Sequence, residues 1–135
     1  RSTPILMHEC QFCAKVDEKD FRWENDHAVA FADRYPVGPG HTLVVPRVHQ
    51  SDLFRLDPIV RAEVWALVDD VHRDLLKDLG ADGFNVGLNE GTAARRTVDH
   101  AHVHVIPRFN GDMPDPRGGI RWVLPENADY WSHRP

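Results

Sequence analysis

VDHAHVHVIP, residues 98–107, is the stretch of sequence that decides the fold. Histidines alternate there with small or apolar residues, and strict alternation over such a run predicts a β-strand. Side chains two residues apart lie on the same face of a strand. One face of this strand is therefore expected to carry all three imidazoles, while the residues between them project into the core. The three histidines are His100, His102 and His104.

This histidine row has three interpretations. A solvated strand face tolerates imidazoles without any function. Three neighbouring imidazoles can also hold one metal ion. In the third interpretation the row is divided, so that one ring binds a metal and the others serve chemistry. Each imidazole has two nitrogens that need partners, so a row buried only for packing is not expected.

The only two cysteines, Cys10 and Cys13, have C-x-x-C spacing. Two cysteines are too few for a disulfide framework, which leaves a redox pair or half of a metal site. The flanks, ECQFCAK, lack the strand-to-helix context of a thioredoxin-like redox motif. Structural zinc takes four ligands from Cys and His. His49 and His100 are candidates for the two missing ligands, since each lies at the end of a predicted strand, but the spacing alone leaves the choice of histidines open.

Upstream of the histidines, the sequence predicts three further elements. Residues 21–35 contain two short aromatic or β-branched runs and predict a β-hairpin. PVGPGH, residues 36–41, is a turn rich in Pro and Gly. TLVVP, residues 42–46, predicts a strand that is buried on both faces. Ser51 and Asp52 are expected to cap a short helical turn.

One long helix is expected between Asp57 and Gly80. Asp57 is a typical N-cap, Pro58 suits the first helical position, and glycine commonly ends a helix. Apolar residues fall on one stripe at helical spacing, which is typical of a helix that covers a sheet. The stripe consists of Val60, Val64, Leu67, Val68, Val71, Leu75 and Leu79.

The remaining elements complete an α+β fold class. FNVGLN, residues 84–89, predicts a strand, and EGTAARRT, residues 90–97, predicts a loop that leads to the histidine strand. The order of hairpin, strand, helix and hairpin favours a mainly antiparallel sheet. We divide the chain into an N-terminal tail or leader (1–9), one domain (10–108) and a C-terminal tail that packs on it (109–135). Whether residues 1–6 are native stays open.

Length and composition exclude several classes of protein. The chain has 135 residues, of which 41% are hydrophobic and 27% charged, as expected for one globular domain. Its formal net charge of −5 argues against duplex nucleic acid as a partner, because phosphate binding needs a basic face. No apolar run approaches the roughly 18 residues of a membrane span. No signal peptide is visible, so a cytoplasmic location is expected.

Four segments together resemble the histidine triad (HIT) superfamily of nucleotide hydrolases and transferases. They cover most of residues 10–108, and the histidine motif is highly specific in combination with its flanks. The tail GDMPDPRGGIRWVLPENADYW, residues 111–131, resembles that of a bacterial HIT subgroup. The four segments are HAHVHVIPR (100–108), AFADRYPVGPGHTLVVPRVH (30–49), NVGLNEG (85–91) and TVDH (97–100).

The resemblance implies a HIT-like fold with a five-stranded, mainly antiparallel sheet, one long helix and one short helix. It also implies a homodimer whose sheets join. The implied substrate is a purine nucleotide with a leaving group on its α-phosphate, such as a dinucleoside polyphosphate or a nucleoside phosphoramidate. In zinc-bearing members the structural Zn²⁺ is held at positions that match Cys10, Cys13, His49 and His100.

The resemblance also assigns roles to residues of the site. His102 matches the nucleophile, which forms a nucleotidyl-histidine intermediate and releases a nucleoside monophosphate. His104, the second catalytic histidine, matches a position that contacts the phosphate or leaving group. The other matching positions bind substrate: Asn89 and Thr97 the phosphate, Asp33 the ribose, and His41 the edge of the pocket.

One departure affects the expected substrate. Members of the family usually have Gly-Gln where this chain has Arg95 and Arg96. Arg96 is expected to bind extra phosphate oxygens and to favour dinucleoside polyphosphates, unless both arginines point to solvent. The departure also leaves open a second function, a nucleotide-binding or partner-binding module with little turnover.

For Trp122 and Trp131 three roles stay open: closing the pocket, lying on the dimer interface, or docking on the sheet.

Overall fold

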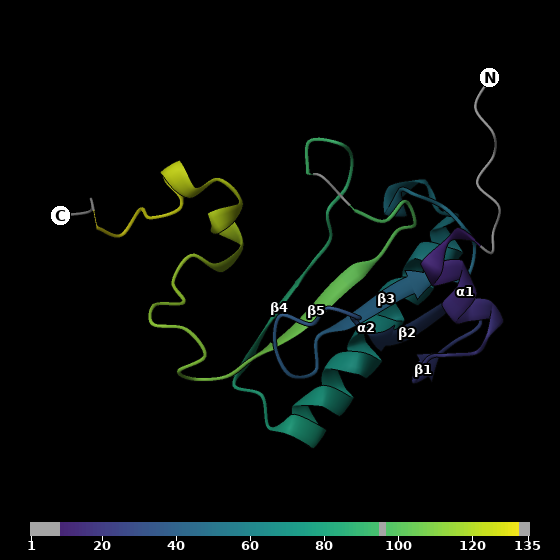
Figure 1. Cartoon of the computed structure of the whole chain (residues 1–135), viewed down its shortest axis with the longest axis horizontal. Helices are drawn as coiled ribbons and strands as arrows, with labels where there is room; N and C mark the ends of the chain where they lie inside the picture. Colours follow the sequence, from purple (N-terminus) through teal and green to yellow (C-terminus); the bar gives the residue numbers. More distant parts are fainter. Residues whose placement is uncertain (1–8, 95–96, 133–135) are drawn as a thin grey trace.

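A single antiparallel sheet organises the chain. The computed structural model, drawn in Figure 1, describes residues 9–94 and 97–132. The strands lie in the order β1-β2-β3-β5-β4, and every neighbouring pair is antiparallel. This arrangement confirms the predicted α+β fold with five strands. The strands are β1 (Trp23–Glu24), β2 (Ala28–Ala32), β3 (Thr42–Pro46), β4 (Gly83–Gly87) and β5 (Val103–Arg108), and the α-helices are α1 (Gln11–Asp17) and α2 (Pro58–Leu79).

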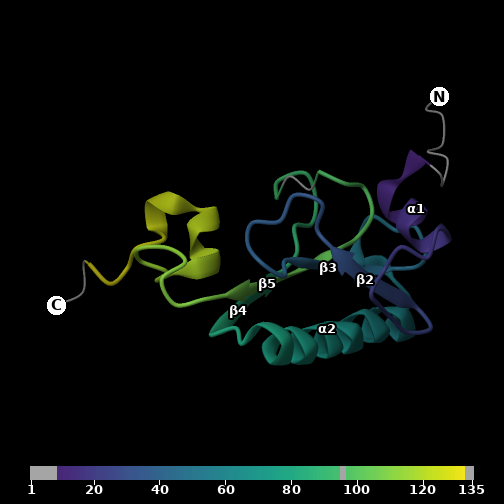
Figure 2. The same ribbon diagram turned by 60° about the horizontal axis from the view of Figure 1, so that its bottom comes forward.

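The two α-helices cover opposite faces of the sheet (Figure 2). The long helix α2 lies along one face and forms the larger core with alternate residues of β2, β3 and β5. The short helix α1 lies over the other face, where Phe12 and Cys13 pack on side chains such as Phe31 and Val45. The strand β3 therefore buries both of its faces, as predicted, and all five of its residues are buried. In β5 only the face toward α2 is fully buried.

The ends of α2 are those that the sequence predicts. The carboxylate of Asp57 accepts a hydrogen bond from the backbone N–H of Ile59 at 2.9 Å, and Pro58 occupies the first turn. Gly80 ends the helix in the left-handed conformation, with φ of 63°. Of the predicted apolar stripe, Leu79 is the exception, because it is 42% exposed at the last turn.

The bounds of two predicted elements differ in the structure. The strand expected over 84–89 is β4, which ends at Gly87. Asp52 does precede a 3-10 helix, η2 (Leu53–Arg55), but its side chain makes no capping hydrogen bond and pairs with Arg55. The prediction that Asp52 caps this helical turn with its side chain is therefore wrong.

The strand expected over 98–107 starts late, because β5 begins at Val103. Its pairing with β3 reaches only as far as Val44 opposite Val103. Pro46 lacks the backbone N–H that a longer antiparallel ladder would use. Its carbonyl oxygen instead accepts a hydrogen bond from Nε2 of His100 at 2.8 Å, so a side chain replaces the next backbone contact.

The C-terminal tail begins with a turn that an ion pair stabilises. It continues as two 3-10 helices, η3 (Gly119–Val123) and η4 (Pro125–Asn127). Arg108 and Asp112 pair at its start through two contacts of 2.7 and 2.8 Å. Trp131 packs within the tail, 4.8 Å from the guanidinium of Arg117. Over residues 9–94 and 97–132, no helix has the length and apolar character needed to cross a membrane.

Gly40 shapes the turn that carries His41. Its φ is +82°, and a Cβ at this position would lie 2.5 Å from Cδ1 of Leu79 and 3.0 Å from Cγ of Pro107. Gly40→Ala should therefore lower the free energy of unfolding by about 1–3 kcal/mol in denaturant titrations. Gly38→Ala is the matched control, since nothing lies within 4 Å of its Cβ. Equal losses in the two variants would contradict this explanation.

Candidate functional site

The histidine row lies on the face of the sheet that α1 covers. Ala101, Val103 and Val105 belong to the core under α2, whereas the rings of His100 and His102 lie 5.8 and 5.1 Å from the ring of Phe12 in α1. The predicted alternation thus extends through the irregular backbone before β5. Because His100 and His102 are buried and His104 is partly buried, the histidines are not a solvated strand face.

The first imidazole joins the two cysteines and His49. Nδ1 of His100 lies 3.4 Å from Sγ of Cys10 and 3.6 Å from Sγ of Cys13, and Nδ1 of His49 lies 3.3 Å from Sγ of Cys13. All four donor atoms lie within 4.8 Å of one another. The structure therefore brings together the four residues that the sequence proposes as metal ligands.

This group of donors fits a tetrahedral zinc ion. Zn–S bonds of about 2.3 Å and Zn–N bonds of about 2.0 Å place S and N roughly 3.5 Å apart at tetrahedral angles. His100 donates its Nε2 hydrogen to the carbonyl of Pro46, so the lone pair of Nδ1 faces the thiols. Burial and the neighbouring Cys10 raise the pKa of the Cys13 thiol to about 12 without a metal, and a bound cation would supply the charge that a thiolate needs.

Cys10 also serves the local backbone, which the sequence analysis missed. It is the N-cap of α1, and its sulfur accepts a hydrogen bond from the backbone N–H of Cys13 at 3.4 Å. The C-x-x-C motif therefore spans the first turn of a helix. The cysteines are fixed on one rigid element, and the two histidines approach them from the strand ends.

Among the described residues, only one ring nitrogen of His102 has a hydrogen-bond partner. It is 7% exposed, and its Nδ1 donates a hydrogen bond to the backbone carbonyl of His100 at 2.8 Å. A neutral imidazole that donates from Nδ1 has its lone pair on Nε2. The ring also lies 5.1 Å from the ring of His104, measured between centroids. His102 thus has the tautomer that a nucleophile at Nε2 requires.

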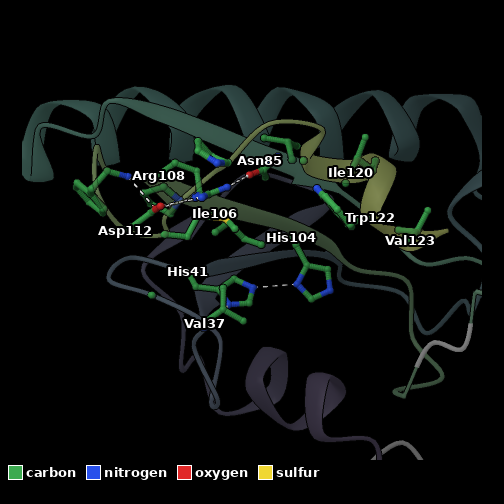
Figure 3. A pocket seen from close by; sticks show the side chains of 18 of the residues that line it. Val37, His41, Asn85, His104, Ile106, Arg108, Asp112, Ile120, Trp122 and Val123 are labelled. Atoms are coloured by element: carbon green, nitrogen blue, oxygen red, sulfur yellow. Dashed lines mark hydrogen bonds and ion pairs between the residues drawn. The ribbon is translucent and has the colours of Figure 1, made fainter. Parts of the chain in front are cut away.

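A chain of hydrogen bonds determines the tautomer of His104. The backbone N–H of Val37 donates to Nδ1 of His41 at 3.1 Å, so a neutral His41 carries its hydrogen on Nε2. That Nε2 donates to Nδ1 of His104 at 2.9 Å. A dashed line joins the two rings in Figure 3. His104 therefore keeps its own hydrogen on Nε2 and can donate it to a ligand. Oδ2 of Asp33 lies 3.4 Å from the same Nε2 of His41 and favours this arrangement.

The same chain argues against a metal ion at these residues. Asp33, His41 and His104 form a second group of donor atoms within 4.8 Å of one another. An ion would need the lone pair of His41 at Nε2, but the N–H of Val37 requires that lone pair at Nδ1. Among the residues that the structure describes, the three histidines of the row do not form one group of metal donors. The geometry thus agrees with a divided row.

Burial keeps His104 neutral. It lowers the pKa of His104 to about 4, and the neighbouring His102 and His41 act in the same direction. An unfolded chain would take up a proton on this residue near pH 6.5, as an ordinary histidine does. The stability that this group contributes is therefore complete above about pH 6.5 and is lost as the pH falls toward about 4.

We expect His104 to stay neutral, with its hydrogen on Nε2, between about pH 5 and 8. Two-dimensional ¹⁵N NMR of the imidazoles measures both the charge and the tautomer. In His41→Phe the donor to Nδ1 is lost, so the His104 signals should move toward a mixture of tautomers. A protonated His104 at about pH 6 in the wild-type chain would contradict this assignment.

The other proposed substrate-binding residues lie in different surroundings. Asp33 is partly buried, and its Oδ1 accepts a hydrogen bond from the backbone N–H of Tyr35 at 2.8 Å. Asn89 lines a cavity together with His41 and His104. Thr97 is exposed in the loop before His100. Arg96 and its neighbour Arg95 lie outside the described residues.

Sequence reasoning missed the groups that orient the histidines. These are the backbone N–H of Val37, the carbonyls of Pro46 and His100, and the ring of Phe12. Backbone donors and acceptors have no side-chain signature, so no residue pattern could reveal them. Phe12 could have been noticed as the apolar residue enclosed by the C-x-x-C motif.

Comparisons with known proteins point in one direction. Residues 14–111 match the HIT domain family. The chain is 37% identical over 109 residues to an uncharacterised HIT-like protein of Saccharolobus solfataricus, and the matched residues cover 78% of each of the two chains. It is 42% identical over 84 residues to an AP-4-A phosphorylase of Mycobacterium tuberculosis, covering 62% of this chain and 43% of that protein. The crystal structure of a zinc-bound histidine triad family protein from Mycobacterium smegmatis superimposes with a TM-score of 0.71 and 37% identity over 81% of each chain.

Proposed function

This chain belongs to the HIT domain family, and from that premise we propose that it is a nucleotide hydrolase or nucleotidyl transferase that acts at an α-phosphate through His102. The observation that carries the proposal is the hydrogen bond from Nδ1 of His102 to the carbonyl of His100. It holds the lone pair on Nε2, where an attacking group needs it. The similarity to an AP-4-A phosphorylase supports a nucleotide as the substrate.

The proposed reaction has two steps. In the first, Nε2 of His102 bonds to phosphorus, and the bond from phosphorus to the leaving atom breaks. The electron pair stays on the leaving atom, which takes up a proton from solvent. In the second, water bonds to phosphorus and gives up a proton, while the bond to Nε2 breaks and its electron pair returns to His102. The products are a nucleoside monophosphate and the leaving group, and another acceptor in place of water gives a transfer reaction.

The hydrogen bond to the His100 carbonyl also serves the intermediate. A histidine bonded to phosphorus through Nε2 carries a positive charge while Nδ1 keeps its hydrogen. The carbonyl oxygen of His100 accepts that hydrogen at 2.8 Å and stabilises the charge in a site where His102 is buried. The same bond therefore orients the ring before attack and favours the charged state after it.

The neighbouring residues bind the substrate in this proposal. His104 donates its Nε2 hydrogen to a phosphate oxygen or to the leaving atom, and His41 fixes its tautomer. Asn89 and Thr97 contact the phosphate, and Asp33 accepts from the ribose hydroxyls. Arg96 is retained as a phosphate-binding residue because a guanidinium suits phosphate oxygens.

We further propose that Cys10, Cys13, His49 and His100 hold a structural Zn²⁺. The ion would supply cross-linking of α1 to the ends of β3 and β5, with no open position for water. The zinc-bound relative and the donor geometry support this assignment. His100 then has two tasks, since its ring is a ligand and its carbonyl orients His102.

The biological unit and location also remain proposals. We propose that the biological unit is a homodimer whose sheets join. We also propose that the protein is located in the cytoplasm. In each chain, residues 10–108 form the proposed domain and residues 109–135 pack on it. The sheet supports the proposed dimer, because β4 lies at the edge of the sheet. Among the described strands, β4 pairs only with β5. A strand edge of this kind is suited to pairing with another chain.

The experiment that tests the function is an assay of AMP release. The chain is incubated separately with adenosine 5′-phosphoramidate and with diadenosine tetraphosphate, and the products are separated by chromatography. Release of AMP from either compound at enzymatic rates supports the proposal. Tight nucleotide binding without AMP release would instead favour the binding module.

A further inference from the structure

Phe12 lies between the two cysteines in the sequence and against the proposed nucleophile in the fold. It is the third residue of the C-x-x-C motif, in the first turn of α1, and is 5% exposed. Its ring centroid lies 5.1 Å from that of His102, and the two ring planes meet at 72°. This contact joins α1 directly to the imidazole that is proposed to attack phosphorus.

The hydrogen bond at Nδ1 does not by itself fix the ring of His102. The bond to the carbonyl of His100 determines where Nδ1 lies, but the ring plane can still turn about the line of that bond. Such a turn keeps the tautomer and moves Nε2, the atom that must meet phosphorus. Reacting groups need to be held within about 0.5 Å and 10–20° of their productive geometry. A second contact on the ring is therefore required.

Two aromatic neighbours supply contacts of this kind. The ring of His104 lies 5.1 Å from that of His102 at 64°, which nearly equals the geometry of Phe12. Both arrangements are edge-to-face, a favoured geometry for aromatic rings. His104 is also proposed to donate a hydrogen bond to the substrate. Phe12 has no such task, so it can hold His102 in the same way before and after the substrate binds.

The ring of Phe12 is itself held on several sides. It lies 5.8 Å from the ring of His100 at 74° and 5.5 Å from the ring of Phe31 at 57°. Its backbone lies between Cys10 and Cys13, which both belong to the proposed zinc site. A buried side chain in close-packed surroundings has little room to change its rotamer. The position of α1 therefore determines the position of this ring.

We propose that Phe12 is a positioning residue for the transfer reaction, and that its ring fixes the plane of His102 so that Nε2 meets the phosphorus atom. The inference rests on the proposed function, since it needs His102 as the nucleophile. It gives α1 a task besides metal binding, because the helix carries the ring that contacts the nucleophile. The covalent steps are unchanged, and Phe12 takes up no proton or electron pair in them.

Phe12→Leu tests the proposal, because leucine keeps an apolar side chain in this place but removes the ring. Phe12→Met is a second variant, since methionine adapts to irregular space in a core and also lacks a ring. Phe31→Leu is the matched control. Phe31 is also 5% exposed and packs on Phe12 in the same cluster, but it makes no ring contact with His102 among the described residues.

Four quantities are measured for each variant and for the wild-type chain. Steady-state kinetics with adenosine 5′-phosphoramidate give kcat and KM for AMP release. Differential scanning calorimetry gives Tm, and elemental analysis gives the zinc content. Two-dimensional ¹⁵N NMR of the imidazoles follows the ring of His102 without any need for turnover.

Phe12→Leu and Phe12→Met should lower kcat by about 10–100-fold, since a displacement of about 1 Å can cost 10²-fold. KM should change by less than about threefold, because the residues that bind the substrate are untouched. The ¹⁵N signals of His102 should shift but keep the pattern of the Nδ1–H tautomer. Phe31→Leu should lower Tm by a similar amount and keep kcat within about threefold of the wild-type value. A merely structural role of Phe12 would not separate the two positions in kcat.

Three results would overturn the inference. A wild-type kcat in folded Phe12→Leu or Phe12→Met would show that His102 needs no support from this ring. Equal falls in kcat at both positions would assign Phe12 to general packing. Loss of zinc from Phe12→Leu, with kcat no lower than in the zinc-site variant Cys13→Ser, would assign the effect to the metal site. No AMP from the wild-type chain would reject the proposed function itself, and the His102 signals would then still show whether Phe12 holds the ring.

Discussion

Replacing His102 by alanine is expected to abolish AMP release while nucleotide binding survives. The expected fall in kcat is at least about 10³-fold, because no other group takes over the bond to phosphorus. His104 cannot do so in the observed arrangement, since its Nδ1 accepts from His41 and its Nε2 carries the hydrogen. Single-turnover kinetics measure the loss, and isothermal calorimetry with AMP measures binding.

Two further variants make this result interpretable. His102→Asn keeps a polar side chain beside the His100 carbonyl and should be equally inactive, even if the smaller alanine disturbs packing against Phe12. His72→Ala removes an exposed histidine of α2 and should retain wild-type activity. Full activity in folded His102→Ala would refute the mechanism.

Removing the proposed zinc ion is expected to have the largest effect on stability. When the free concentration of an ion is about 1,000 times its Kd, binding adds about 4 kcal/mol to the free energy of unfolding. For a domain of this size each kcal/mol shifts Tm by roughly 3–6 °C, so Cys13→Ser should lower Tm by about 10 °C or more. Cys13 is the sensitive position, because its sulfur lies within 3.6 Å of Nδ1 in both His49 and His100. Differential scanning calorimetry and elemental analysis measure stability and zinc content.

Cys13→Ser should reduce catalytic activity less than it reduces stability. The hydrogen bond that orients His102 is to a backbone carbonyl, which Cys13→Ser leaves in place. We therefore expect kcat to fall less than tenfold at temperatures well below the lowered Tm. A strong chelator should bring the wild-type Tm close to that of Cys13→Ser. Equal Tm values with and without the chelator would contradict a structural zinc ion.

The parts of the fold that follow local rules were predictable from the sequence. The helix α2 begins at an Asp-Pro pair and ends at a glycine. Asp57 acts through its side-chain carboxylate, and Pro58 and Gly80 act through their backbone geometry. The strand β3 is a short apolar run between a turn and a proline, and all of it is buried. Alternation placed the three histidines on one face, although only His104 lies within the regular strand.

The start of β5 and the tautomers were not predictable, because they depend on contacts between distant segments. Pro46 and His100 meet only after folding, and their hydrogen bond ends the regular pairing of β3 with β5. The N–H of Val37 acts on His41 because the intervening turn closes at Gly40. The cavity needs the C-terminal tail to fold beside β4, and no periodic pattern in the tail predicts that placement.

The most direct test of the central claim is to trap the covalent intermediate. The chain is mixed with excess adenosine 5′-phosphoramidate, quenched within one turnover under alkaline conditions that preserve phosphorus–nitrogen bonds, and digested for peptide mapping by mass spectrometry. The account predicts an adenylyl group on His102, attached at Nε2, that forms and decays at the rate of AMP release. An adenylyl group on His104, or turnover with no modified histidine at any time, would contradict it.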